Sequence, residues 1–208
     1  MANPTFKDET AKADVTAAIR EIESATSAEV VVALRPRSGH YRHTDYLVGF
    51  AVSFAALLVF LFDAHEFSLA FMPVDTLAAF ALGTLLSANV PPLRRALTSR
   101  KLMTANVKTA ARAAFVDLKI SRTSGRTGLL VFASMFERRV EVVFDIGIDT
   151  VVLGPAFGDA IRALDAAVRR GASFPRFLTA LRSLGPILQK TLPRLDGDVN
   201  ELPDEPSA

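Results

Sequence analysis

Two apolar stretches, residues 46–62 and 73–90, constrain this chain more than any other feature. The first has 17 residues and no charge, and as a helix it would span roughly 26 Å, close to the thickness of a bilayer's hydrocarbon core. The second contains one ionisable residue, Asp75. Pro73 suits the first position of a helix, where the helix dipole favours a nearby carboxylate. We therefore predict two membrane-crossing helices, a hairpin that returns the chain to the compartment it left.

The rest of the chain is long enough for one domain only. We predict the first part of this domain over 1–45, a transmembrane hairpin over 46–90, the second part over 91–195, and an acidic disordered tail over 196–208. The sequence contains no cysteine, which excludes disulfides, cysteine nucleophiles and thiolate zinc sites. The first residues lack the basic and apolar regions of a signal peptide.

Basic residues flank the hairpin and are absent from its connection, which contains Asp63, His65 and Glu66. Positive charge marks the cytoplasmic side of a membrane. We therefore expect a multi-pass protein of the plasma (inner) membrane with both termini in the cytoplasm. Residues 91–145 carry 11 basic and 4 acidic residues, which favours contact with anionic lipid headgroups. No nucleic-acid-binding motif or aromatic interleaving accompanies them, so we expect no nucleic-acid partner.

The remaining pattern alternates helices and strands. Apolar residues at helical spacing predict helices over about 4–25 and 101–119, and others beginning at Pro155 and after Ser173. Strands are predicted over 29–34, 127–134 and 139–145, the last two as an antiparallel hairpin. The continuous apolarity of 29–34 is typical of a central strand buried on both faces. The fold class is α/β: a small sandwich with a central sheet flanked by helices and interrupted by the two-helix hairpin.

Four segments in this order resemble the TPM domain family, in particular its bacterial, membrane-inserted branch. They are Ser-Ala-Glu-Val-Val-Val at 27–32, Thr-Gly-Leu-Leu at 127–130, Glu-Arg-Arg-Val-Glu-Val at 137–142 and Asp-Ile-Gly-Ile at 145–148. The resemblance implies a phosphatase-like α/β domain with a metal or phosphate site made by acidic residues at strand ends. The chain lacks the family's glycine-rich C-terminal extension and carries its hairpin inside the domain, so the phosphatase label transfers poorly.

The sequence offers one candidate metal site. Asp145 and Asp149 flank Gly147 directly after a strand, and Glu29 begins another strand. Carboxylates at one sheet end suit a hard cation, so calcium or magnesium is expected there rather than zinc. The alternative is that Asp145 and Gly147 form the turn that ends the strand, with Asp149 solvated or capping a helix.

Other motifs give no complete active site. Arg138 and Arg139 could hold phosphate, or belong to a charged turn; His40 and His43 have H-x-x-H spacing but precede a membrane segment, which favours an interfacial flank. No P-loop, G-x-G-x-x-G or G-x-S-x-G motif is present. We expect a membrane-tethered binding or assembly module whose partners are the bilayer and a membrane protein complex. The alternative is a metal-dependent hydrolase of phosphate esters that uses the Asp145 loop.

Overall fold

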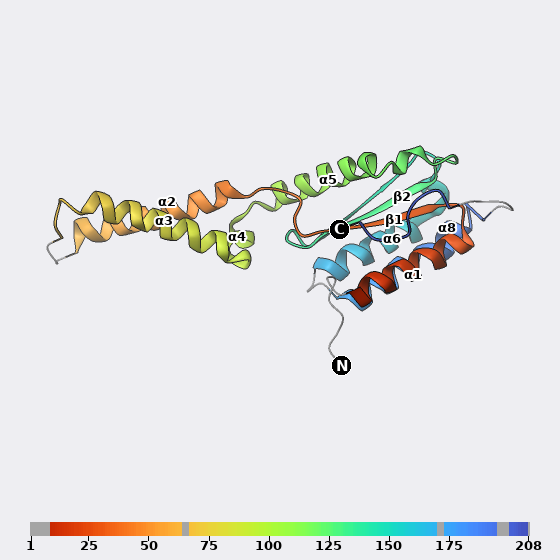
Figure 1. Ribbon diagram of the computed structural model, residues 1–208, viewed down its shortest axis with the longest axis horizontal. Coiled ribbons are helices and arrows are strands. Elements are labelled where there is room, and N and C mark those ends of the chain that lie inside the picture. The colour runs from red at the N-terminus through yellow and green to blue at the C-terminus, as the bar shows by residue number, and fades with distance from the viewer. Residues whose placement is uncertain (1–8, 64–66, 170–172, 195–199, 208) are drawn as a thin grey trace. The chain divides into compact units, whose positions relative to one another are not determined.

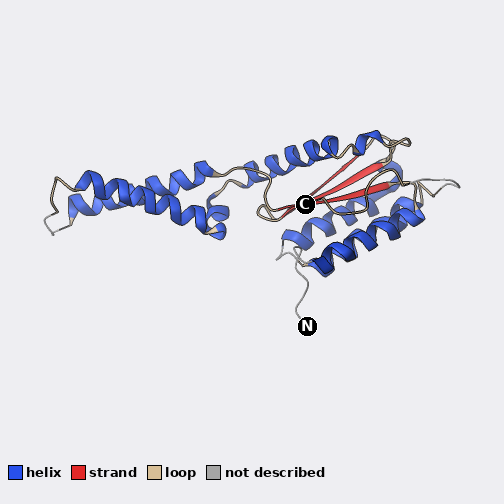
Figure 2. Cartoon of the chain, in the orientation of Figure 1, coloured by secondary structure: helices blue, strands red, loops and turns tan. Residues whose placement is uncertain are grey.

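The computed structural model describes residues 9–63, 67–169, 173–194 and 200–207. The chain divides into two compact units, one made of residues up to Ser38 together with those from Thr104 onward, and the other of Gly39–Met103. Figure 2 shows that the strands lie in the first unit and that the second is helical. A domain interrupted by a helical insertion is therefore the observed organisation.

A three-stranded mixed sheet forms the centre of the first unit. Its strands are β1 (Glu29–Arg35), β2 (Gly128–Ser134) and β3 (Arg139–Phe144), in the order β1-β2-β3. β1 pairs with β2 in parallel, and β2 with β3 as the predicted antiparallel hairpin. The prediction that the first strand is central is wrong, because β2 is the central strand and β1 lies at an edge. A continuous run of apolar residues indicates that both faces of a strand are buried. It does not indicate how many strands pair with its two edges.

Helices cover both faces of this sheet (Figure 1). One face packs against α1 (Glu9–Ala25), α6 (Thr150–Arg169), α7 (Phe174–Arg182) and α8 (Leu184–Gln189). The other face packs against α5 (Arg100–Asp117) and the short helix η1 (Ile120–Arg122). The α/β class with a helix-flanked sheet is confirmed.

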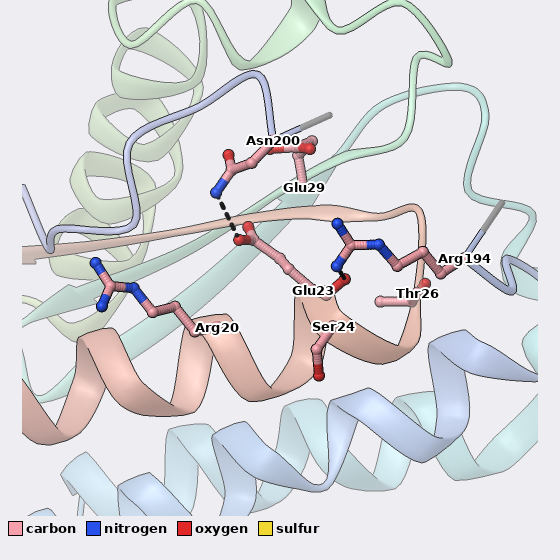
Figure 3. Close-up of a pocket in the computed structure, with 7 residues that line it drawn as sticks. All are labelled: Arg20, Glu23, Ser24, Thr26, Glu29, Arg194 and Asn200. Atoms are coloured by element: carbon pink, nitrogen blue, oxygen red, sulfur yellow. Dashed lines mark hydrogen bonds between the residues drawn. The ribbon is translucent and has the colours of Figure 1, made fainter. Parts of the chain in front are cut away.

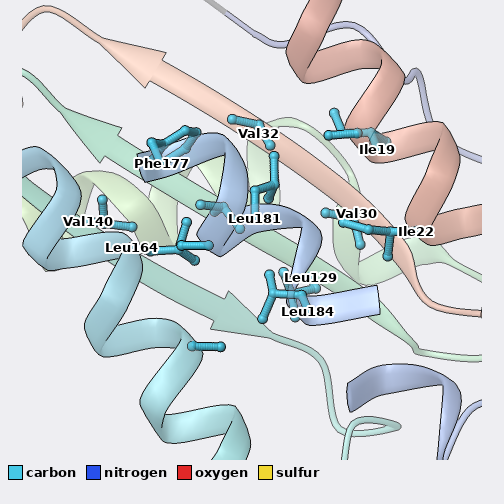
Figure 4. Packing of buried hydrophobic residues seen from close by; sticks show 14 of the residues in the cluster. Ile19, Ile22, Val30, Val32, Leu129, Val140, Leu164, Phe177, Leu181 and Leu184 are labelled. Atoms are coloured by element: carbon cyan, nitrogen blue, oxygen red, sulfur yellow. The ribbon is translucent and has the colours of Figure 1, made fainter. Parts of the chain in front are cut away.

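Side chains alternate between the two faces, as the pleat of a strand requires. Val30 and Val32 point toward α1 and α7, where Ile19, Ile22 and Phe177 are fully or almost fully buried (Figure 4). Val31 and Ala33 point the other way into a smaller cluster with α5. Each fully buried apolar side chain of this size stabilises the fold by about 1.5–3 kcal/mol, so β1 is anchored through both faces.

The helix predicted to begin at Pro155 is the main part of α6. One further turn precedes it from Thr150, separated by a break at Gly154. Gly154 has φ +69°, a left-handed conformation inside the helix range Thr150–Arg169. Glycine adopts this conformation without a steric penalty. The single turn before Gly154 is therefore separated from the main helix, which does start at Pro155.

The outer edge of β1 is covered by the end of the chain. Ser207 donates its backbone N–H to the Val32 carbonyl oxygen over 2.9 Å and accepts the Leu34 N–H over 2.8 Å. This bridge is parallel to β1. The prediction of a disordered tail over 196–208 differs from this observation for residues 200–207, while 195–199 and 208 lie outside the described residues.

The second unit contains the helices α2 (Arg42–Phe62), α3 (Met72–Asn89) and α4 (Pro91–Leu97). Two glycines allow α2 and α3 to approach closely. A Cβ atom on Gly49 would lie 2.7 Å from the Phe80 carbonyl oxygen, and one on Gly83 would lie 3.0 Å from the Gly49 Cα. Small residues at such contacts are typical of helix pairs that pack without a hydrophobic driving force from water.

The outward surface of this helix pair is apolar. In the part of the chain that the structure describes, α2 is long and apolar enough to span a membrane by itself. α3 meets the same test only together with α4, across a bend of 100°. Pro73, Asp75 and Asn89 lower the hydropathy of α3. Large side chains that remain exposed on α2 include Leu47, Phe50, Phe54, Leu58, Val59, Leu61 and Phe62.

Candidate functional site

A cavity of about 210 Å³ lies where the end of α1, the start of β1 and the C-terminal segment meet. Its walls carry charged and polar side chains from three parts of the chain that are distant in sequence (Figure 3). The lining residues are Arg20, Glu23, Ser24, Thr26, Glu29, Arg194 and Asn200. Two carboxyl groups and two guanidinium groups thus surround one small hollow.

Glu23 is buried because it continues the apolar face of α1. It follows Ile19 by one helical turn, so it faces the sheet rather than the solvent, and only 9% of it is exposed. Its Oε1 accepts the Val30 N–H over 2.9 Å, and its Oε2 accepts the Asn200 Nδ2–H over 3.2 Å. The side chain therefore connects α1, β1 and the C-terminal segment.

Burial in this position raises the pKa of Glu23 to about 8. The nearby carboxyl groups of Glu29 and Asp204 raise the pKa further, and the hydrogen bond from Val30 opposes them. A carboxyl group with this pKa is largely protonated at neutral pH, so it can donate as well as accept a hydrogen bond. Perturbed groups of this kind gather at functional sites and also in buried structural networks.

The two arginines of the cavity have different roles. Arg194 donates from Nη1 to the backbone carbonyl oxygen of Glu23 over 3.0 Å, close to the end of α1. Arg20 pairs through Nε with Asp204 Oδ2 at 2.8 Å, and 68% of the Arg20 side chain is exposed. Burial raises the pKa of Asp204, but hydrogen bonds from Arg20 and Asn200 outweigh it and leave that pKa below its ordinary value. The C-terminal segment is thus held partly by charge.

The three predicted metal ligands have different environments. Glu29 lines the cavity, is 7% exposed and accepts the Leu202 N–H at Oε2 over 3.2 Å. Asp145 is buried at the end of β3, where Arg126 donates from Nη2 to Oδ1 over 3.1 Å. Arg126 Nε also lies 2.9 Å from Asp145 Oδ2, as an ion pair. Asp149 accepts the Val151 N–H over 2.8 Å, which is a helix cap.

No metal-ligand set is assembled by these residues. Among residues 9–63, 67–169, 173–194 and 200–207, no three His, Cys, Asp or Glu side chains lie close enough to hold a metal ion. The contacts of Asp145 are those of a turn residue. Its Oδ1 accepts the Ile146 N–H over 2.8 Å, and its backbone carbonyl accepts the Ile148 N–H over 3.1 Å. Binding of calcium or magnesium by Asp145, Asp149 and Glu29 stays a prediction.

The charged segment between β2 and β3 forms a turn, and one of its charged side chains is buried. Glu137 is 3% exposed, accepts the Ser38 N–H at Oε1 over 2.9 Å and accepts the Ser134 hydroxyl at Oε2. Arg138 has φ +50°, in the left-handed region. Glu137 therefore joins the β2–β3 turn to the chain that follows β1, which is a structural role.

Sequence reasoning did not single out Glu23, Arg20 or Asn200. One signal was available, since Glu23 follows Ile19 by four residues and so falls on the apolar stripe of its helix. A lone glutamate on such a stripe is worth examining, because carboxyl groups are almost never fully buried without a partner. The tail residues gave no comparable signal, since their composition is that of a solvated segment.

Comparison with known proteins supports the fold. No protein-family model matches the chain, and no curated protein matches it. The chain is similar to the NMR structure of BA42 protein from the psychrophilic bacterium Bizionia argentinensis, with 17% sequence identity and a TM-score of 0.58. The similarity covers 99% of this chain and 97% of that one. At this identity the likeness concerns the fold alone.

Proposed function

We propose that this chain is a membrane-tethered binding or assembly module, with the α2–α3 hairpin in the bilayer and the α/β unit facing the cytoplasm. The observation that carries the proposal is the exposed apolar surface of α2, where Phe54 and Leu58 are 52% and 41% exposed. Monomeric soluble proteins rarely leave so continuous an apolar surface in contact with water. The α/β unit, in contrast, buries its own core.

Close contact of α2 and α3 at Gly49 and Gly83 supports the second crossing. The partners in this proposal are the lipid bilayer and a membrane protein complex, in a bacterial inner membrane. Resemblance to the TPM domain family is consistent with a domain of this kind. The proposed binding surface is the end of the α/β unit that contains Glu23 and the outer edge of β1.

The alternative, a metal-dependent hydrolase of phosphate esters, would act at Asp145. There the carboxylate is engaged by the Arg126 guanidinium and by a backbone N–H. A metal ion would have to replace the guanidinium as the counter-charge. The observed contacts therefore favour the binding module.

Membrane fractionation tests the proposal. The chain expressed in bacteria should sediment with membranes and resist extraction by alkaline carbonate. Replacing Phe54 and Leu58 together by Lys should move it out of the carbonate-resistant fraction, because charge near the centre of a bilayer is costly. Val116→Lys is the matched control, since Val116 is 64% exposed on α5 and lies outside the hairpin. Complete extraction of the unmodified chain would refute the membrane tether.

A further inference from the structure

The outer edge of β1 carries backbone groups that face away from the sheet. Along a strand, the backbone N–H and carbonyl groups of successive residues point alternately to the two sides. Residues 29, 31, 33 and 35 direct theirs toward β2, so residues 30, 32 and 34 direct theirs outward. An edge strand of this kind is a template for pairing with another extended segment. β1 is also firmly held, with Val30, Val31 and Val32 at most 3% exposed, so it is a rigid template.

Two groups of this chain already occupy that edge. The Glu23 carboxyl accepts the outward N–H of Val30 at one end. Further along, Ser207 exchanges two backbone hydrogen bonds with Val32 and Leu34 and runs parallel to β1. A side chain and a short C-terminal segment therefore bind three outward groups of this edge, the Val30 N–H, the Val32 carbonyl and the Leu34 N–H.

The covering segment uses side chains as well as backbone. Leu202 packs on the hydrophobic cluster beneath α5, and its N–H bonds to the Glu29 carboxyl over 3.2 Å. Two residues later, Asp204 pairs with Arg20 at 2.8 Å. An apolar residue, an acidic residue and a backbone bridge thus define what this edge recognises.

We propose that the outer edge of β1 is a strand-addition site for an extended peptide segment of a partner protein, which residues 200–207 of this chain occupy in its absence. The recognised segment runs parallel to β1, with an apolar residue at the Leu202 position and a carboxylate at the Asp204 position. Main-chain hydrogen bonds supply affinity in such sites, and the side-chain contacts supply specificity. The inference deepens the proposed binding function and depends on it for the role of the partner.

Exchange is feasible because most of the contacts that hold the occupying segment are polar and lie near the surface. They include hydrogen bonds from the Ser124 N–H and hydroxyl to the Glu201 carboxylate, which are exposed to water. Ser207 makes two backbone hydrogen bonds, and the net contribution of each is small because the groups that it frees bond to water instead. The Arg20–Asp204 pair is exposed on its arginine side, and ion pairs exposed to water contribute little to stability. A partner segment with the same pattern can therefore compete for the edge.

A labelled peptide with the sequence of residues 200–207, Asn-Glu-Leu-Pro-Asp-Glu-Pro-Ser, tests the proposal on the full chain in mild detergent. Ser207→Pro removes the N–H that Val32 accepts, because proline has no backbone donor. Ser207→Ala is the matched control, since it keeps the backbone group and loses only the side-chain hydroxyl. Fluorescence anisotropy should show about 2- to 12-fold tighter peptide binding to the Ser207→Pro chain than to the Ser207→Ala chain, the range that loss of one hydrogen bond gives.

A charge exchange tests the specificity of the site. Arg20→Glu in the Ser207→Pro chain should weaken binding of the native peptide, and a peptide with Asp204→Arg should regain it. Equal binding to the Ser207→Pro and Ser207→Ala chains, or no binding to either, overturns the proposal. Should the Ser207→Pro chain fail to fold, Asp204→Arg in the full chain gives the same comparison, because Asp204 lies outside the hydrophobic clusters. Membrane fractionation tests the membrane tether independently, so failure of peptide binding can be distinguished from failure of the proposed function.

Discussion

Arg94 binds the Asp45 carboxylate through two nitrogens, with Nε 2.7 Å from Oδ1 and Nη2 2.8 Å from Oδ2. The pair joins α4 to the first turn of α2, and Ser87 of α3 adds a hydrogen bond to the same carboxylate over 2.8 Å. The side chains are only 6% exposed for Asp45 and 16% for Arg94. One buried ionic network therefore connects the three helices of the second unit at one end.

Arg94→Ala should destabilise the helical unit by about 3–5 kcal/mol, since it leaves a buried carboxylate without its counter-charge. The double variant with Asp45→Asn should lose less, because no unpaired charge remains. Thermal unfolding in mild detergent measures both, with Lys101→Ala at an exposed position as the control. Equal melting temperatures for Arg94→Ala and Lys101→Ala would contradict the network.

Stability should depend on pH through Glu23. The folded state holds the Glu23 proton up to about pH 8, whereas the unfolded chain releases it near pH 4.5. The free energy of unfolding should therefore fall as pH rises between these values, by up to about 1.4 kcal/mol per pH unit from this group. Glu23→Gln should make the free energy of unfolding depend less on pH. Glu21→Gln, on the exposed side of α1, should leave that dependence unchanged. Denaturation curves from pH 5 to 8 check this; identical slopes would dismiss the role of Glu23.

Membrane topology can be read with single cysteines, since the native chain has none. Cysteines replacing His40 and Ser124, both exposed, should be protected from an impermeant thiol reagent in intact cells, and one replacing Ser68 should react. The reason is the positive charge on both flanks of the hairpin and its absence from the connection. Permeabilised cells are the control, in which all three should label. Reaction at His40 or Ser124 in intact cells would reverse the orientation.

Cation binding at the Asp145 loop is tested by ligand-linked stability. If calcium or magnesium binds there, a hundredfold excess over its dissociation constant should stabilise the chain by about 2.7 kcal/mol. Asp145→Asn should remove that shift, and Asp159→Asn, exposed on α6, should keep it. Melting curves with and without each ion decide the matter, and an unshifted native curve at millimolar ion would leave Asp145 as a turn residue.

The strands could be predicted from sequence because local signals decide them. Three short apolar runs bounded by turn residues gave β1, β2 and β3 within a residue or so, and the short link at 135–138 gave the β2–β3 hairpin. The position of β1 at an edge could not be predicted. It depends on the number of strands that the chain supplies, and a three-stranded sheet has only one interior position.

The candidate site was less predictable for a different reason. Its residues come from α1, β1 and the C-terminal segment, and their meeting depends on packing across the whole unit. Glu29 was identified from its place at the start of a strand, but its contact with Leu202 could not be inferred from spacing. The capping alternative for Asp149 agrees with its contact at the start of α6, whereas the pairing of Asp145 with Arg126 was not identified.

Parallel pairing of β1 with β2 has a consequence for how the chain is made. The paired residues, such as Val31 and Leu130, lie roughly a hundred positions apart, and such long-range contacts form slowly. During synthesis β1 leaves the ribosome long before β2, at about 5–20 residues per second. The hairpin, whose contacts are local, emerges between them. In the proposed membrane tether, insertion of the hairpin would therefore precede completion of the sheet. A nascent β1 with both edges unpaired would need protection during that interval.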